Sequence, residues 1–111
     1  MNIVTLCGRI SHKFDINEYG KGKDKTKIIR FTVAVGRTED VTDFIPVKAF
    51  NKLAEVIDEH FEVGDQIIIS ASINTGKYDN DDGDTVYTMD IIANRIEFGA
   101  KKLEKKGKKN G

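Results

Sequence analysis

The segment Thr42–Lys52 (TDFIPVKAFNK) combines aromatic and basic side chains at alternating positions. Because successive side chains of an extended chain point to opposite faces, this segment carries two rows of side chains. One row is wholly aliphatic: Ile45, Val47 and Ala49. The other row contains Phe44, Pro46, Lys48 and Phe50. We expect the aliphatic row to face a core, which leaves two aromatic rings on an outer face beside a positive charge.

Exposed aromatic rings beside a positive charge suit the binding of unpaired nucleic-acid bases. Bases stack on such rings whatever the sequence, and each stack contributes roughly 1 to 3 kcal/mol. Phe44 and Phe50 can supply the rings, while Lys48 and Lys52 can hold backbone phosphates. The same phosphate-binding role is predicted for six further basic residues: Arg9, Arg30, Lys21, Lys23, Lys25 and Lys27.

Each of these assignments has a structural alternative. A strand that is apolar on both faces is also consistent with burial on both, so Phe44 or Phe50 can be a core or interface residue. Exposed arginines on strands are common, and lysines at a hairpin tip are most often only solvated. The rings therefore carry the prediction of nucleic-acid binding, and the basic residues support it.

Alternating patterns elsewhere predict four more strands. They cover residues 3–10 (IVTLCGRI), 28–36 (IIRFTVAVG), 65–78 (DQIIISASINTGKY) and 85–98 (TVYTMDIIANRIEF). In the first of these, Val4, Leu6 and Ile10 face inward, and Gly8 marks a bulge or a close approach of two backbones. In the next, Phe31 belongs to the core. Residues 11–27 hold two glycines and five lysines, which predicts a flexible basic hairpin tip.

One short helix is predicted to follow the segment with the two phenylalanines. Asn51 is its expected N-cap, and Gly64 is expected to end it. Its apolar face is formed by Leu53, Val56, Ile57 and Phe61, and its other face is acidic, with Glu55, Asp58, Glu59 and Glu62.

Five strands with a helix between the third and the fourth give the element order of the OB-fold, a barrel that binds oligonucleotides or oligosaccharides. We therefore predict an all-β fold, a five-stranded antiparallel OB-fold barrel with one short helix between strands 3 and 4. SH3-like barrels and small mixed α/β domains fit the order less well because of where the helix falls.

The chain resembles the bacterial and phage single-stranded DNA-binding proteins over nearly all of residues 2–98. Five segments carry the resemblance, in order: NIVTLCGRI, FTVAVGR, TDFIPVKAFNKLAEVI, VGDQIIISASINTGKY and GDTVYTMDIIANRIEF. It implies that rings on the third strand and at the end of the fourth stack on bases, and the matching residues are Phe44, Phe50 and Tyr78. Lys77, beside Tyr78, then joins the phosphate contacts. The resemblance also implies a homo-oligomer, with a tetramer favoured over a dimer, built through the first strands, where Ile3, Thr5 and Cys7 form the outer row.

Two features depart from that family. The chain has no tryptophan, and phenylalanine or tyrosine stands where the family commonly has one, which predicts weaker stacking. The long tail that ends in acidic residues and a phenylalanine, and that recruits repair and replication enzymes, is absent from KKLEKKGKKNG. Such a short form looks like a phage-encoded member or a trimmed protein.

Charge is distributed unevenly along the 111 residues. Residues 1–100 hold 12 Lys/Arg against 17 Asp/Glu, whereas residues 101–111 hold 6 against 1. We predict one domain over residues 1–100 and a basic, flexible tail over residues 101–111. No apolar run is long enough to span a bilayer and no secretory signal is visible, so we expect the cytoplasm of a bacterium or an infected host. The single cysteine, Cys7, offers neither an intramolecular disulfide nor a metal-binding pair.

Catalysis is not indicated by the acidic cluster DNDDGD, Asp79–Asp84. Paired carboxylates can hold metal ions that cleave phosphodiesters. However, the position of Gly83 would make Tyr78 the first ligand of a calcium loop, and Asp82-Gly83 is an ordinary hairpin-turn signal. His12 and His60 have no nucleophile motif near them. We expect no enzyme activity, no metal, no cofactor and no small-molecule substrate.

We therefore interpret the sequence as a sequence-tolerant binder of single-stranded DNA that protects exposed strands during replication, recombination or repair. Some RNA binding is expected as well, because no residue in the pattern reads a 2′-hydroxyl. The alternative is an OB-fold module for protein interaction or RNA binding. No membrane partner is expected.

Overall fold

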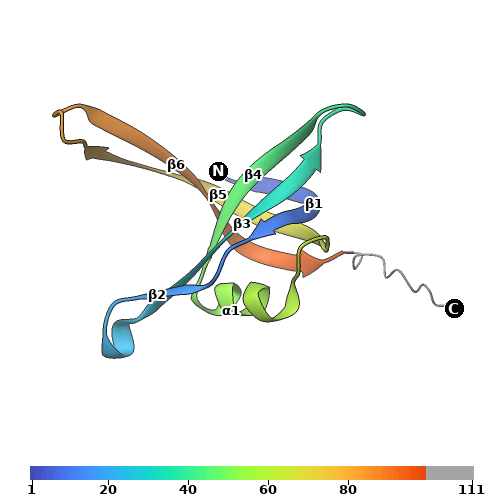
Figure 1. The fold of residues 1–111 in the computed structure, drawn as a ribbon, viewed down its shortest axis with the longest axis horizontal. Coiled ribbons are helices and arrows are strands. Elements are labelled where there is room, and N and C mark those ends of the chain that lie inside the picture. Colours follow the sequence, from blue (N-terminus) through green and yellow to red (C-terminus); the bar gives the residue numbers. More distant parts are fainter. Residues whose placement is uncertain (100–111) are drawn as a thin grey trace, which may run out of the picture.

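Six strands and one α-helix make up the part of the chain that the computed structural model describes, residues 1–99 (Figure 1). The strands are β1 (Val4–Lys13), β2 (Asn17–Tyr19), β3 (Thr26–Gly36), β4 (Thr42–Phe50), β5 (Gln66–Asp79) and β6 (Thr85–Phe98). The helix α1 spans Asn51–His60, and a single 3₁₀ turn, η1, spans Gly22–Asp24. The predicted tail, residues 101–111, lies outside the described residues.

The five long strands close into a barrel. The sheet order is β1-β5-β6-β4-β3-β2, and a further pairing of β1 with β3 completes the ring. The barrel and the position of α1 between β4 and β5 confirm the predicted OB-fold. Two details were wrong: β2 is an additional short strand, and the β4–β6 closure is parallel, through the single pair Lys48 and Ile92.

The predicted inward rows form the core. Val47 and Ala49 of β4 are buried, as are Phe31 and Val33 of β3, and Ile45 packs against them half-buried. Burial of each large aliphatic side chain contributes on the order of 1.5 to 3 kcal/mol to stability. The aliphatic face of β4 is therefore fixed toward the core, and its other row must point outward.

Gly8 marks a close approach, as the sequence predicts. A Cβ atom at this position would collide with the carbonyl oxygen of Ala34 and lie 2.8 Å from a methyl group of Val33. Any side chain would therefore separate β1 from β3. The bulge lies farther along β1, between Ile10 and His12, where the β1–β3 register shifts.

Helix α1 closes one end of the barrel with Ala54 and Ile57. Both predicted ends of the helix were wrong. Phe50 is the N-cap residue, while Asn51 has a φ of 52° and accepts a hydrogen bond on its side-chain oxygen from the backbone N–H of Lys27 at 3.1 Å. The helix ends at His60, and Gly64, with a φ of 101°, lies in the following turn.

The acidic cluster of the β5–β6 hairpin is a turn. The side-chain oxygen of Asn80 accepts hydrogen bonds from the backbone N–H groups of Asp82 and Asp84, each at 3.0 Å. The carboxylates therefore belong to a turn whose backbone is held by the side chain of Asn80. Within residues 1–99, no three His, Cys, Asp or Glu side chains are grouped to hold a metal ion, and no helix is long and apolar enough to cross a membrane.

Candidate nucleic-acid interface

The outer faces of β3 and β4 together form the candidate interface. Their register pairs Phe44 with Ala34, Pro46 with Thr32, Lys48 with Arg30 and Phe50 with Ile28. Directly opposed residues of antiparallel strands share a face of the sheet. The face therefore has an aromatic ring near each end and two basic side chains between them.

The two rings differ in exposure. Phe44 is 62% exposed, so its ring is open to a ligand. Phe50 is half-buried, and it is also the N-cap residue of α1. The structure thus places both rings on the predicted face, with Phe44 the more accessible.

Lys48 is already paired. Its ammonium lies 3.2 Å from the carboxylate of Asp90 on β6. A groove of about 160 Å³ separates β4 from β6 here, lined by Arg30, Pro46, Val47, Lys48, Met89, Asp90 and Ile91. Asp90 was not predicted as a site residue, since nothing in the local pattern of β6 shows which residue of β4 it faces.

The β5–β6 hairpin extends away from the barrel as an arm, at the upper left of Figure 1. Tyr78 is 56% exposed on this arm and lies opposite Val86. Asp90 lies opposite Asn74, four residues before Tyr78, so Tyr78 and Asp90 share one face of the arm. On this face of the arm, Asp90 forms an ion pair with Lys48 of β4. Tyr78 therefore lies on an extension of the outer surface of β4.

Lys77 lies on the other face of the arm. It pairs with Tyr87, which is 77% exposed. Together with Thr75, Gly76, Thr88 and Met89, these residues line a pocket of about 660 Å³. Lys77 and Tyr78 are therefore not brought together as one contact pair. The exposed ring of Tyr87, which was not predicted as a site residue, follows from strand alternation in TVYTMD.

The predicted basic residues fall into two groups. Five of them make no ion pair and no side-chain hydrogen bond with any other residue in the described range 1–99: Arg30, Lys52, Lys77, Lys21 and Lys23. The others are engaged. Arg9, at the start of the β1–β3 pairing, donates a hydrogen bond to the carbonyl oxygen of Gly64 at 2.8 Å.

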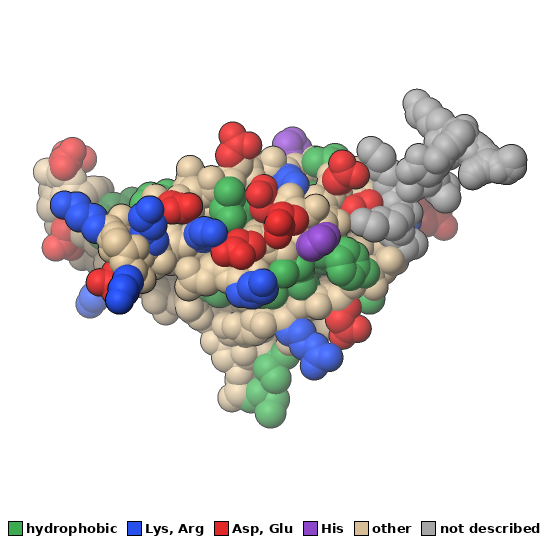
Figure 2. Space-filling view, turned by 90° about the horizontal axis from the view of Figure 1, so that it is seen from below, with side chains coloured by type: hydrophobic (Ala, Val, Ile, Leu, Met, Phe, Trp, Pro, Cys, Tyr) green, Lys and Arg blue, Asp and Glu red, His purple; other side chains and the backbone are tan. Residues whose placement is uncertain are grey.

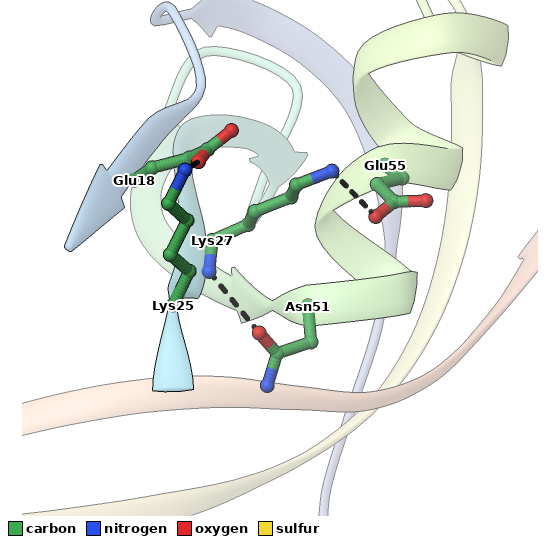
Figure 3. Close-up of polar contacts among 5 residues, drawn as sticks. All are labelled: Glu18, Lys25, Lys27, Asn51 and Glu55. Carbon is green, nitrogen blue, oxygen red and sulfur yellow. Dashed lines mark hydrogen bonds and ion pairs between the residues drawn. The ribbon is translucent and has the colours of Figure 1, made fainter. Parts of the chain in front are cut away.

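Lys25 and Lys27 are both engaged by acidic side chains (Figure 3). The Lys25 ammonium lies 3.7 Å from Glu18, and the Lys27 ammonium donates a 2.8 Å hydrogen bond to Glu55 of α1. That hydrogen bond, reinforced by the charge of Lys27, lowers the pKa of Glu55, and the same contact raises the pKa of Lys27. Lys27 therefore belongs to a structural contact between β3 and α1.

The underside of the molecule is acidic. Figure 2 shows carboxylates gathered in the middle of this face, with several Lys or Arg side chains at one end and others among and beside the carboxylates. Helix α1 lies on this side in Figure 1 and carries the exposed Asp58 and Glu59, followed by Glu62. These carboxylates make the α1 side less favourable to an anionic ligand than the β3–β4 face, where Arg30 and Lys48 lie opposite each other.

Residues 1–99 match the single-strand binding protein family. The chain belongs to this family. Single-strand binding proteins are binding proteins and not enzymes, in agreement with the interpretation of the acidic turn.

Two relatives illustrate the match. The chain is 36% identical over 100 residues to the single-stranded DNA-binding protein of Clostridium perfringens, covering 88% of this chain and 65% of that protein. It is 32% identical over 110 residues to the single-stranded DNA-binding protein of Fusobacterium nucleatum, covering 92% of this chain and 69% of that protein. The chain thus spans about two thirds of the length of these relatives.

Among solved structures, the fold is similar to the mitochondrial single-stranded DNA-binding protein Rim1 of S. cerevisiae. The TM-score is 0.65 at 16% identity, and the match covers 89% of this chain and 95% of that chain. This similarity confirms the OB-fold of this single-strand binding family member.

Proposed function

We propose that this protein binds single-stranded DNA with little sequence preference and protects exposed strands during replication or recombination. The observation that carries the proposal is the outward row of β4, in which Phe44 and Phe50 flank the cross-strand pair of Lys48 and Arg30. Stacking on rings is tolerant of sequence because every base has a flat face. The basic pair between the rings suits the phosphates that link stacked bases.

Tyr78 extends this surface along the arm. Its ring is exposed on the same face of the arm as Asp90, and Asp90 lines the groove between β4 and β6. A strand that stacks on Phe44 and continues over the groove can reach Tyr78 without crossing the acidic α1 side. We assign the three rings to bases, and Arg30, Lys48 and Lys52 to phosphates.

A gel shift with labelled oligo-dT tests the proposal. Unlabelled single-stranded DNA should displace the probe, whereas duplex DNA of the same length should compete poorly because paired bases hide their faces. Some competition by RNA is expected. Equal competition by duplex would show that phosphate attraction alone drives binding. Absence of any shift would favour the alternative, a protein-interaction module.

We further propose a homo-oligomer, with a tetramer as the preferred form. Ile3 is 61% exposed, and Thr5 and Cys7 follow it on the outward row of the first strand. An exposed isoleucine immediately before a barrel strand gains from burial against another copy. Light scattering should report a mass of about four times the 12.4 kDa of one chain, and Ile3→Asp should reduce it.

A further inference from the structure

The outward face of β3 and β4 continues onto β1. Strand β3 pairs with β4 on one side and with β1 on the other. Two rows therefore cross three strands: Arg9, Ala34 and Phe44 form one, and His12, Thr32 and Pro46 form the other. The face available to a ligand is three strands wide.

The bulge in β1 sets which residues join this face. Because the register shifts between Ile10 and His12, His12 lies opposite Thr32 and Lys13 lies opposite the buried Phe31. Lys13 therefore points to the barrel end, where its ammonium donates hydrogen bonds to the carbonyl oxygens of Asp58 and Phe61 at 3.0 and 2.9 Å. Cations are favoured at this end of a helix.

Phe14 comes next and points the other way. Its backbone N–H donates a hydrogen bond to the carbonyl oxygen of Arg30 at 3.0 Å, which extends the pairing by one residue. Since Lys13 is anchored inward, alternation places Phe14 on the outward face beside Arg30. Phe14 is 56% exposed.

Phe14, Arg30 and Lys48 thus form a third row across the face. Neighbouring strands lie about 4.8 Å apart, so the backbone at Phe14 lies roughly 10 Å from β4, with β3 and Arg30 between them. Arg30 has no ion pair within residues 1–99, whereas Lys48 is held by Asp90. The β1 side of the row therefore offers a free ring next to a free guanidinium.

We propose that Phe14 is a further base-stacking residue, which holds a nucleotide on the β1 side of Arg30. This inference rests on the proposed function and adds a direction to it: the strand crosses the sheet from β4 toward β1. Single-stranded DNA is the occupant that fits, because the row is continuous with the Phe44–Phe50 surface and its unpaired charge is positive.

A tryptophan reporter tests this placement directly. The chain contains no tryptophan, so Phe14→Trp introduces a single tryptophan at this position, whose emission can be excited selectively over that of the tyrosines. Its emission should be quenched when oligo-dT is added. The matched control is Phe98→Trp, because Phe98 is 54% exposed but stacks on the buried Phe61, with ring centroids 4.4 Å apart. Equal responses from the two reporters would overturn the proposal.

Affinity provides a second readout. Phe14→Ala should weaken oligo-dT binding by about 5- to 150-fold, the range that loss of one stacked base implies, whereas Phe14→Tyr should retain binding. If wild-type protein binds oligo-dT and Phe14→Ala binds it with the same affinity, the role of Phe14 is refuted, while the proposed function stands. Failure of the wild type to bind would instead refute the proposed function. If Phe14→Ala keeps its affinity but loses oligomer mass, the ring belongs to an interface between copies and the inference is wrong.

Discussion

Lys48 and Asp90 form an ion pair across the groove between β4 and β6, with the ammonium 3.2 Å from the carboxylate. Both side chains are partly exposed, at 30% and 40%. Such pairs contribute little to stability because water and salt screen them. The pair has a larger consequence for binding, since a phosphate that approaches Lys48 must compete with Asp90.

Removal of this carboxylate should strengthen DNA binding. In Asp90→Asn, Lys48 becomes free and a negative charge leaves the proposed path. We expect a gain of about 1.5- to 5-fold in oligo-dT affinity at low salt, from the energy typical of an exposed pair. The slope of log affinity against log salt should steepen by about 0.7 for one added phosphate contact.

The control for this change is Glu62→Gln, which removes the same charge beyond the end of α1, on the acidic side. It should alter the slope much less, because screening weakens interactions beyond about 10 Å at 0.1 M salt. Identical effects of the two variants would show that net charge, and not the freed lysine, governs affinity.

The two rows of β4 predict opposite phenotypes. Phe44→Ala should weaken oligo-dT binding by about 5-fold or more, with the thermal midpoint nearly unchanged, since the ring is exposed. Val47→Ala should leave affinity intact and lower the free energy of unfolding by about 2 kcal/mol, because Val47 is buried. Titration of DNA and thermal unfolding of the same preparations measure both. A stable Val47→Ala and an unfolded Phe44→Ala would mean that the faces were assigned backwards.

The arm offers a comparison of two tyrosines on opposite faces. Tyr78→Ala should reduce affinity for oligo-dT, because Tyr78 lies on the face that carries Asp90. Tyr87→Ala is the matched control and should have little effect, since Tyr87 pairs with Lys77 on the other face. Competition titrations at fixed salt measure both variants. The reverse order of effects would place the strand in the pocket around Met89 instead.

Strand alternation explains what could be predicted from the sequence. The rows of β4 and β3 follow directly from a period of two, and the burial of Val47 and Phe31 confirms them. A shift of the strand register by one residue would turn the aliphatic row outward and the row of Phe44 inward. The alternating pattern therefore also predicts which face carries Phe44. The helix between β4 and β5 was predictable from the spacing of its apolar residues.

Contacts between distant segments were not predictable in this way. Nothing near Lys48 in the chain indicates Asp90, and nothing near Lys27 indicates Glu55, because those pairs depend on strand and helix packing. The outward position of Phe14 depends on a bulge that the sequence does not mark. Asn51 was assigned as a cap from its residue type, yet its side chain accepts from Lys27 instead.

The ion pair of Lys27 and Glu55 should make stability depend on acid pH. Its hydrogen bond lowers the pKa of Glu55 below the ordinary value of 4.5. A carboxyl with a lowered folded-state pKa stabilises the protein above the unfolded pKa, and this contribution is lost as pH falls toward the folded value. Glu55→Gln should therefore have a lower thermal midpoint than wild type at pH 7, and the difference should shrink below about pH 4.5.

Thermal midpoints measured from pH 7 to pH 3 test this. Lys27→Gln should show the same convergence, because it removes the same pair from the other side. A double variant should add little to either single change. A gap that stays constant with pH would show that the side chain of Glu55 stabilises the fold by packing and not by charge.

The lysines before and within β3 should divide into two classes in DNA binding. Lys21 and Lys23 are exposed and unpaired within the described residues, whereas Lys25 and Lys27 face Glu18 and Glu55. If this hairpin contacts phosphates, the double variant of Lys21 and Lys23 to glutamine should flatten the salt slope by up to about 1.4, or 0.7 per lost contact.

The matched double variant of Lys25 and Lys27 to glutamine removes the same charge from the same hairpin. It should flatten the slope less, because each of these lysines is partly neutralised before DNA arrives, and it should lower the thermal midpoint through loss of the contact with Glu55. Equal slopes for the two double variants would mean that DNA displaces the acidic partners. A slope unchanged in both would remove the hairpin from the path and leave Arg30, Lys48 and Lys52 to hold the phosphates.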